Sequence, residues 1–181
     1  MPVAFFLHLF SMSEVQKHAH ASSAQRIAAC AVITVSDTRT EETDKSGRTM
    51  REKLTAAGHT IVHYQIIRDE PSDIRALLGH LATNPQFSVI LLNGGTGISR
   101  RDTTFDVVDA MLEKRLPGFG EIFRMLSYDD IGPAAFLSRA TAGIINGKIL
   151  FSLPGSTGAV TLGMEKLILP ELSHLLNELE K

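Results

Sequence analysis

The chain has 181 residues, of which 44% are hydrophobic and 21% are charged, and its formal net charge is -2. This length suits one domain built around one sizeable core. The charge argues against nucleic acid as a partner, because such proteins need a basic surface. The single cysteine, Cys30, excludes an internal disulfide and is compatible with a cytoplasmic location.

Residues 1–25 are predicted to be a flexible or peripheral extension that precedes one α/β domain at 26–181. The apolar opening, MPVAFFLHLF, is far too short to cross a bilayer. It also has no positive flank, which a secretory signal would carry. Met12 offers an alternative start, and the polar stretch after it is typical of a solvated tail. We therefore expect no membrane partner.

The region from 28 to 92 alternates between strand and helix patterns. Three short runs rich in apolar and β-branched residues predict strands at 28–36, 60–67 and 87–92. Two amphipathic runs between them predict helices at 43–58 and 68–83. Strand, helix, strand, helix, strand at this spacing predicts a parallel sheet with helices on both faces.

Helix boundary signals accompany these runs. Thr43 or Asp44 can cap the first helix, and Gly58 can end it. Pro71 marks the first turn of the second helix. Cys30 lies inside the first strand run, AACAVITVS, so we expect an inert, buried thiol.

The second half of the chain predicts a hairpin and further helices. Thr103 and Asp106 resemble a capping box that opens a helix over 103–115. A loop broken by glycines, within 117–128, then leads to another helix. Asn146-Gly147 lies between two apolar runs at 142–153, which predicts a type I′ hairpin that adds an antiparallel element to the sheet. The last segment, 154–179, is a glycine-rich turn followed by a helix that Pro170 can kink.

Four polar loops are expected at the carboxyl edge of this sheet, where open α/β sheets bind ligands. They are SDTRT (36–40), RDEP (68–71), NGGTGISRRD (93–102) and LPGSTG (153–158). The last two place Gly, Ser and Thr just ahead of a helix, where free N–H groups favour phosphate. Plain turn chemistry is the alternative for either loop alone. Neither the P-loop pattern nor the dinucleotide fingerprint is present, because Ile98 and Arg100 occupy required positions.

Two aspartates complete the candidate site. Asp69 and Asp102 each follow an arginine at a predicted strand-to-helix junction, and Asp37 has a similar position. Such carboxylates can hold Mg²⁺ together with substrate phosphates and water. The structural alternative is that Asp69 caps the helix after Pro71 and that Asp102 pairs with a neighbouring arginine.

Five motifs in this order resemble the MoaB branch of the MogA/MoaB family of molybdenum cofactor proteins. They are VITVSDTRT, NGGTGISRRD, PGFGEIFRMLSYDDIG, LSRA and LPGS, and the resemblance covers about residues 27–179. It implies a Rossmann-like, three-layer α/β/α sandwich with a mostly parallel sheet. It also implies molybdopterin binding and, in catalytic members, transfer of AMP from Mg²⁺-bound ATP to the terminal phosphate of the pterin, with release of pyrophosphate.

The resemblance implies roles for particular residues. Asp69 and Asp102 match the two aspartates regarded as essential in the adenylyltransferases, and they would also hold the metal. Arg100 or Arg101 could stabilise charge on the substrate. The substrate-binding set would be Ser36, Asp37, Asn93, Gly94, Gly95, Thr96, Gly97, Arg101, Ser138, Pro154, Gly155 and Ser156.

Two questions stay open at this stage. Some MoaB branch members have no assigned catalytic role, so a non-catalytic pterin-binding or scaffolding subunit of the same pathway is the alternative to an adenylyltransferase. An unrelated nucleotide-processing domain of the same fold is a third possibility. The resemblance also implies a homotrimer or a hexamer, and contacts with other proteins of the pathway are possible partners.

Overall fold

A computed structural model describes residues 26–181, and the predictions for the N-terminal extension lie outside this range. Six strands form one sheet in the order β2-β1-β3-β6-β5-β4. The four parallel strands are β1 (Ala29–Val35), β2 (Thr60–Ile67), β3 (Val89–Asn93) and β6 (Lys148–Leu153). The predicted α/β class with a mostly parallel sheet is confirmed.

The antiparallel end of the sheet is the predicted hairpin. β5 (Thr141–Ile145) runs antiparallel to β6, and the short β4 (Lys114–Arg115) runs antiparallel to β5. Asn146 and Gly147 both have positive φ angles, 45° and 70°, as a type I′ turn requires.

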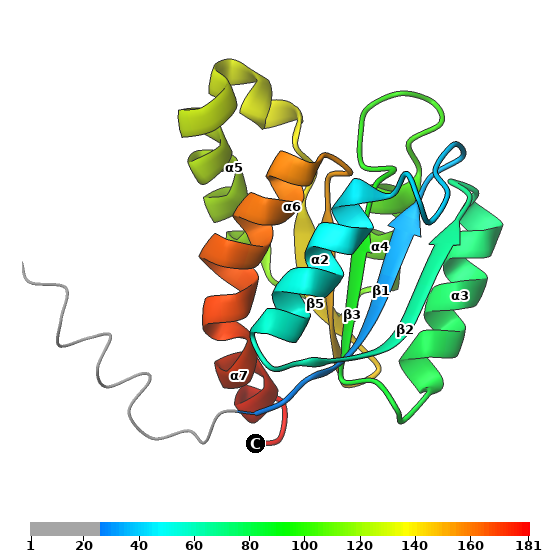
Figure 1. The fold of residues 1–181 in the computed structure, drawn as a ribbon, viewed down its shortest axis with the longest axis vertical. Helices are drawn as coiled ribbons and strands as arrows, with labels where there is room; N and C mark the ends of the chain where they lie inside the picture. The colour runs from blue at the N-terminus through cyan, green and yellow to red at the C-terminus, as the bar shows by residue number, and fades with distance from the viewer. Residues whose placement is uncertain (1–25) are drawn as a thin grey trace, which may run out of the picture.

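Helices cover both faces of the sheet, which confirms the three layers (Figure 1). On one face lie α2 (Lys45–Ala56), α5 (Pro117–Ile131) and a C-terminal run of α6 (Thr157–Gly163), a π-helical segment (Met164–Ile168) and α7 (Leu169–Glu178). On the other face lie α3 (Pro71–Thr83) and α4 (Thr104–Met111).

The alternation of side chains along β1 shows how the two cores are built. Cys30 and Val32 face the core under α2 and α7, whereas Ala31 and Ile33 face the core under α3 and α4. All four are fully buried, as expected for a strand inside a parallel sheet. Cys30 is therefore a buried thiol, as the sequence predicts, and burial raises its pKa to about 12.

The segment after α4 differs from the sequence prediction. The predicted helix over 103–115 ends at Met111, because Glu113 and Leu116 donate backbone hydrogen bonds to the hairpin strand β5. The predicted glycine-broken loop is also wrong, since α5 begins directly at Pro117. Gly120 lies inside this helix, where a Cβ atom would be 2.6 Å from the carbonyl oxygen of Ala140. The glycine thus permits close packing rather than breaking the helix.

One further local prediction needs correction, and the structure adds detail to another. Thr103 forms no side-chain cap on α4, because its hydroxyl donates to Asp69 instead. In the C-terminal run, the irregularity is the π-helical segment at Met164–Ile168, and Pro170 lies in the first turn of α7. Proline has no N–H group to donate, and the N–H of Leu169, just before it, donates to the carbonyl of Met164 in the π-helical segment.

Candidate anion-binding site at the carboxyl edge of the sheet

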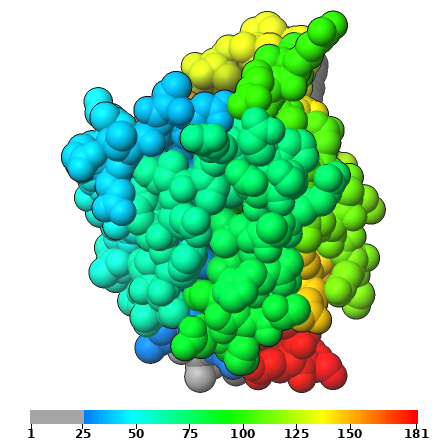
Figure 2. Space-filling model, turned by 90° about the vertical axis from the view of Figure 1, so that its right-hand side faces the viewer, coloured from blue at the N-terminus to red at the C-terminus, as the bar shows by residue number. Residues whose placement is uncertain are grey.

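The predicted loops do meet at one edge of the sheet. They follow β1, β2, β3 and β6. The chain places β2 on one side of β1 and β3 on the other, and open α/β sheets bind ligands at such a switch in strand order. A cavity of about 340 Å³ opens there. The long loop between β3 and α4, residues 94–103, rises above this edge at the top of Figure 1 and projects in green at the top of Figure 2. We call these residues the glycine loop.

Eight of the predicted site residues line this cavity, and four others contribute from outside it. The lining residues that the sequence predicted are Ser36, Gly94, Gly95, Thr96, Gly97, Asp102, Pro154 and Gly155. Asn93 is fully buried below it, Arg101 belongs to the glycine loop, and Asp37 and Asp69 contact that loop. Ser138 and Ser156 line a neighbouring cavity of about 240 Å³ that shares Pro154 with the first.

Asp69 is buried, and its carboxylate lies at the start of α4. Its Oδ1 atom accepts hydrogen bonds from the backbone N–H and the hydroxyl of Thr103, at 3.1 and 2.7 Å. Burial raises the pKa of Asp69, the bonds from Thr103 oppose that rise, and the charges of Asp102 and Asp37 add to it. The residue therefore does not cap α3, the structural alternative that the sequence left open.

Asp102 lines the cavity and lies against Gly97. Its Oδ2 atom accepts a hydrogen bond of 3.0 Å from the N–H of Ser99, and a Cβ atom on Gly97 would be 2.6 Å from the same oxygen. Within residues 26–181, neither Asp69 nor Asp102 forms an ion pair with a basic side chain. Two neighbouring carboxylates without a cationic partner are suited to hold a divalent cation.

The described part of the chain contains no cluster of three or more His, Cys, Asp or Glu residues with metal-ligand geometry. This finding concerns clusters of those four side-chain types within residues 26–181. It is compatible with Mg²⁺, which is commonly held by one or two carboxylates, with substrate phosphates and water as the other ligands.

Arg101 is engaged on the outer side of the glycine loop. Its guanidinium donates to Asp37 at 2.6 Å and to Glu70 at 2.9 Å. The hydrogen bond from Arg101, followed by that from the N–H of Asp69, lowers the pKa of Asp37. These groups connect the three loops that follow β1, β2 and β3.

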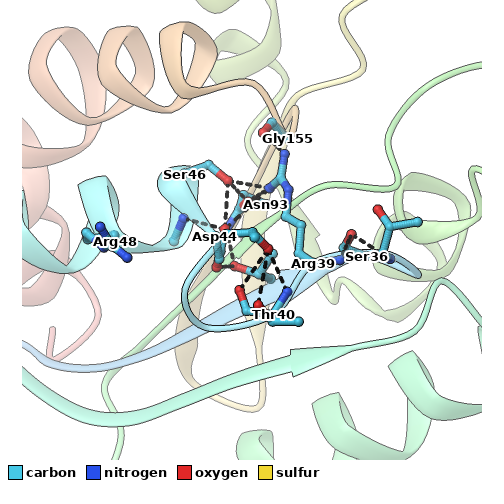
Figure 3. A network of polar contacts seen from close by, with 12 residues as sticks. Ser36, Arg39, Thr40, Asp44, Ser46, Arg48, Asn93 and Gly155 are labelled. Atoms are coloured by element: carbon cyan, nitrogen blue, oxygen red, sulfur yellow. Dashed lines mark hydrogen bonds and ion pairs between the residues drawn. The ribbon is translucent and has the colours of Figure 1, made fainter.

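Arg39 is the basic residue of the cavity wall, and the sequence analysis did not single it out. Its Nη2 atom donates to the carbonyl of Gly155 at 2.7 Å, which ties the loop after β1 to the loop after β6. Its Nη1 atom contacts Asp44, Ser46 and Asn93 (Figure 3). The signal was present, because Arg39 lies within the quoted SDTRT motif.

The network under Arg39 is buried and centres on Asp44. This residue is the N-cap of α2, where its Oδ1 atom accepts from the N–H of Gly47 at 3.0 Å. Its Oδ2 atom accepts from Thr34 at 2.6 Å and from Tyr64 at 2.8 Å. Burial opposes ionisation of Asp44, but these hydrogen bonds outweigh burial and hold its pKa below the ordinary value.

Asn93 links this network to the glycine loop. Its amide nitrogen donates to Thr34 at 2.9 Å, and its oxygen accepts from Ser46 at 2.7 Å. Because Asn93 is fully buried, its side chain supports the site from below and does not face the cavity.

The fold and the candidate site define an α/β protein with a glycine-rich loop, and with two carboxylates that have no ion-pair partner among residues 26–181, at the carboxyl edge of its sheet. Residues 31–174 match the family model described as a probable molybdopterin binding domain. The chain is 53% identical over 163 residues to molybdenum cofactor biosynthesis protein B of Halalkalibacterium halodurans, an alignment that covers 90% of this chain and 96% of that protein.

Solved structures agree with the sequence comparison. A crystal structure of molybdenum cofactor biosynthesis protein B matches with a TM-score of 0.84 and 50% identity, covering 87% of this chain and 98% of that one. The tungsten cofactor synthesizing protein MoaB from Pyrococcus furiosus matches with a TM-score of 0.78 and 38% identity, covering 87% and 100%. The chain therefore belongs to the MogA/MoaB family of molybdenum cofactor biosynthesis proteins, on its MoaB branch.

No helix within residues 26–181 is both long and apolar enough to span a membrane.

Proposed function

We propose that the protein transfers AMP from Mg²⁺-bound ATP to the terminal phosphate of molybdopterin. The observation that carries the proposal is the pair Asp69, beside the glycine loop, and Asp102, within it, neither of which has a basic partner among residues 26–181. A site that only bound an anionic pterin would gain nothing from two uncompensated carboxylates, because they repel a phosphate. A site that takes up Mg²⁺ with a triphosphate requires them.

The reaction joins two anions, so charge must be neutralised before the groups can approach. An oxygen of the pterin phosphate forms a bond to the α-phosphorus of ATP. The anhydride bond between the α- and β-phosphates breaks, and pyrophosphate leaves with the electron pair of that bond. Mg²⁺, when bound with ATP, would supply positive charge to the phosphate oxygens.

The residues of this chain would divide the remaining work. Asp69 and Asp102 would hold the cation, and the N–H groups of the glycine loop would bind phosphate oxygens. Arg39, which also lines the cavity, would add positive charge. Ser138 and Ser156, in the neighbouring cavity, would contact the part of the substrate that extends past Pro154.

The test is release of pyrophosphate from Mg²⁺-bound ATP in the presence of molybdopterin. Asp102→Asn keeps the shape of the side chain and removes its charge. We expect it to lower turnover by on the order of 10²-fold, the scale for loss of one preorganised electrostatic group, and to leave pterin binding nearly intact. Glu52→Gln, on the exposed face of α2 and outside the cavity, is the control for loss of one carboxylate charge.

The outcome separates the enzyme from its alternative. A wild-type protein that binds molybdopterin but releases no pyrophosphate would be a pterin-binding or scaffolding subunit of the same pathway. An Asp102→Asn variant as fast as wild type would remove Asp102 from catalysis.

We also propose that the protein assembles as a homotrimer or a hexamer through an apolar surface on α5 and on the 3-10 helix at Gly132–Leu137. Five large side chains of this surface are exposed: Met125, Tyr128, Ile131, Phe136 and Leu137. Phe136 is 73% exposed, and contiguous apolar surface of this kind marks association sites. Phe136→Glu should reduce the sedimentation coefficient, whereas Val62→Glu, at another exposed apolar position, should not. Equal sedimentation of wild type and Phe136→Glu would contradict the assignment.

A further inference from the structure

The inference concerns Arg139, which the proposed function does not use. Arg139 lies just before β5 and reaches the glycine loop, about forty positions earlier in the chain. Its Nε atom donates to the carbonyl of Thr96 at 2.9 Å, and its Nη2 atom donates to the carbonyls of Gly97 and of Asp102, the latter at 3.3 Å. One side chain thus binds three carbonyl groups of the same loop.

The guanidinium is itself held in place from a second side. Its Nη1 atom lies 3.1 Å from both carboxylate oxygens of Asp106, on the first turn of α4. Its central carbon lies 4.9 Å from the ring centroid of Phe105, within the range of a cation–π contact. A planar fork used in this way is specific to arginine, because lysine has one nitrogen and no fixed geometry.

These contacts determine which way the N–H groups of the loop point. In a trans peptide, the carbonyl of one residue and the N–H of the next point in opposite directions, and residues 26–181 contain no cis peptide. With the carbonyls of Thr96 and Gly97 turned toward Arg139, the N–H groups of Gly97 and Ile98 are turned away from it. No acceptor among residues 26–181 binds these two N–H groups.

The third carbonyl provides an internal check on this geometry. The carbonyl of Asp102 faces Arg139, so the N–H of Thr103 must point away, and it donates to Asp69 at 3.1 Å. One guanidinium therefore separates the two sides of the loop. Carbonyl oxygens, which would repel an anion, face Arg139, whereas the N–H of Thr103 faces Asp69 and those of Gly97 and Ile98 point away from the guanidinium.

We propose that Arg139 is a positioning residue that fixes the glycine loop in its anion-receiving conformation. The inference rests on the proposed function for the identity of the anion, but the loop geometry itself does not. Arg139 does not reach the substrate in this assignment. It acts by orienting the N–H groups of Gly97 and Ile98, and by keeping three carbonyl dipoles away from the phosphate.

The test uses the full chain, with Arg139→Lys and Arg139→Gln as the variants. The matched control is Arg115→Lys, because Arg115 also donates to a carboxylate and to a carbonyl, both of Asp109, but lies outside the cavity. Inorganic pyrophosphate serves as the probe in titration calorimetry, at a temperature well below each melting transition. We expect both Arg139 variants to bind it on the order of 10-fold more weakly, and Arg115→Lys to bind it like wild type.

A second measurement is made without any ligand, so that it does not depend on the proposed function. Backbone ¹⁵N relaxation reports the order of Gly97 and Ile98 on the ps–ns timescale. The order parameter is about 0.85 for a rigid backbone and below about 0.6 for a flexible one. We expect the rigid value in wild type and in Arg115→Lys, and a clear fall in Arg139→Lys, with the remainder of the chain unchanged.

The outcomes are distinguishable. Unchanged order in both Arg139 variants overturns the inference, and so does a loosened loop that still binds pyrophosphate with full affinity. A wild-type protein that binds neither pyrophosphate nor Mg²⁺-bound ATP refutes the proposed function, and the relaxation data still decide whether Arg139 orders the loop.

Discussion

Gly95 is the position at which a single methyl group would disturb the site most directly. Its φ angle is +63°, and an added Cβ atom would lie 2.1 Å from Thr104 Oγ1 and 2.3 Å from Asp69 Oδ2. Gly58, which ends α2, has a φ angle of +84° and no atom within 4 Å of an added Cβ. The two glycines therefore share the left-handed conformation and differ in the space beside them.

This difference separates the cost of the left-handed backbone conformation from the cost of overpacking. Gly58→Ala is expected to lower the free energy of unfolding by about 1–2 kcal/mol, the cost of a left-handed conformation for an L residue. Gly95→Ala bears that cost and also overpacks a filled space, which adds roughly 1–3 kcal/mol. For a chain of this size, each kcal/mol corresponds to a shift of roughly 2–4 °C in melting temperature.

Urea unfolding of both variants measures their stability, and calorimetry with Mg²⁺-bound ATP measures their affinity for the nucleotide. Gly95→Ala should be the less stable variant and should also bind the nucleotide at least about 10-fold more weakly, because relief of the contact moves the Asp69 carboxylate. Gly58→Ala should bind like wild type. Equal stability of the two variants, or full nucleotide affinity in Gly95→Ala, would refute the idea that this glycine makes room for Asp69.

Three further predictions follow from individual groups. Cys30 should not react with a thiol reagent in the native protein, since it is fully buried with a pKa of about 12, so its labelling rate should follow unfolding as urea is added. Asp44 has a lower pKa in the folded protein than its ordinary value of 3.8, so its ionised form stabilises the fold above pH 3.8, and this stabilisation is lost as the pH falls through the folded pKa. At neutral pH, Asp44→Asn should be less stable than wild type by roughly 1.5–3 kcal/mol, because charge-assisted hydrogen bonds are lost. In acid unfolding, this difference should shrink once the pH is below the folded pKa of Asp44. Arg101→Gln should leave the free energy of unfolding close to that of wild type, because its ion pairs are exposed, and any loss of pyrophosphate affinity in calorimetry would then report on binding alone.

Much of the fold could be predicted because its main signals are local. The strand run at 28–36 is continuous because both faces of β1 are covered, and the Asn146-Gly147 turn has the chemistry that its φ angles need. The errors arise where tertiary contacts override local preference. Residues after Met111 continue a helical pattern in the sequence, but backbone bonds to β5 draw Glu113 and Leu116 out of the helix.

The position of the candidate site could be predicted, but the hydrogen bonds between its residues could not. Loops at strand ends must meet at the carboxyl edge, so the glycine loop and both aspartates were identifiable. Nothing local indicates that Thr103 donates to Asp69 or that Arg139 binds Thr96, because these pairs are separated by more than thirty positions and depend on the register of the sheet. Arg39 and Arg139 both lie inside quoted motifs, yet sequence alone does not say which member of a motif supports the loop.

The glycines explain why the candidate site has features of a phosphate site without matching a known phosphate motif. A Cβ atom on Gly94 would lie 2.2 Å from the carbonyl oxygen of Val35, and one on Gly155 would lie 3.1 Å from the Cα atom of Gly94. The ends of β1, β3 and β6 thus meet through backbone atoms, and Gly94 and Gly155 both line the cavity. A wall made of backbone offers N–H groups whose direction is set by residues elsewhere in the chain. The phosphate site that we propose is therefore divided between three strand ends and two distant arginines, whereas a P-loop carries its pattern in one contiguous stretch.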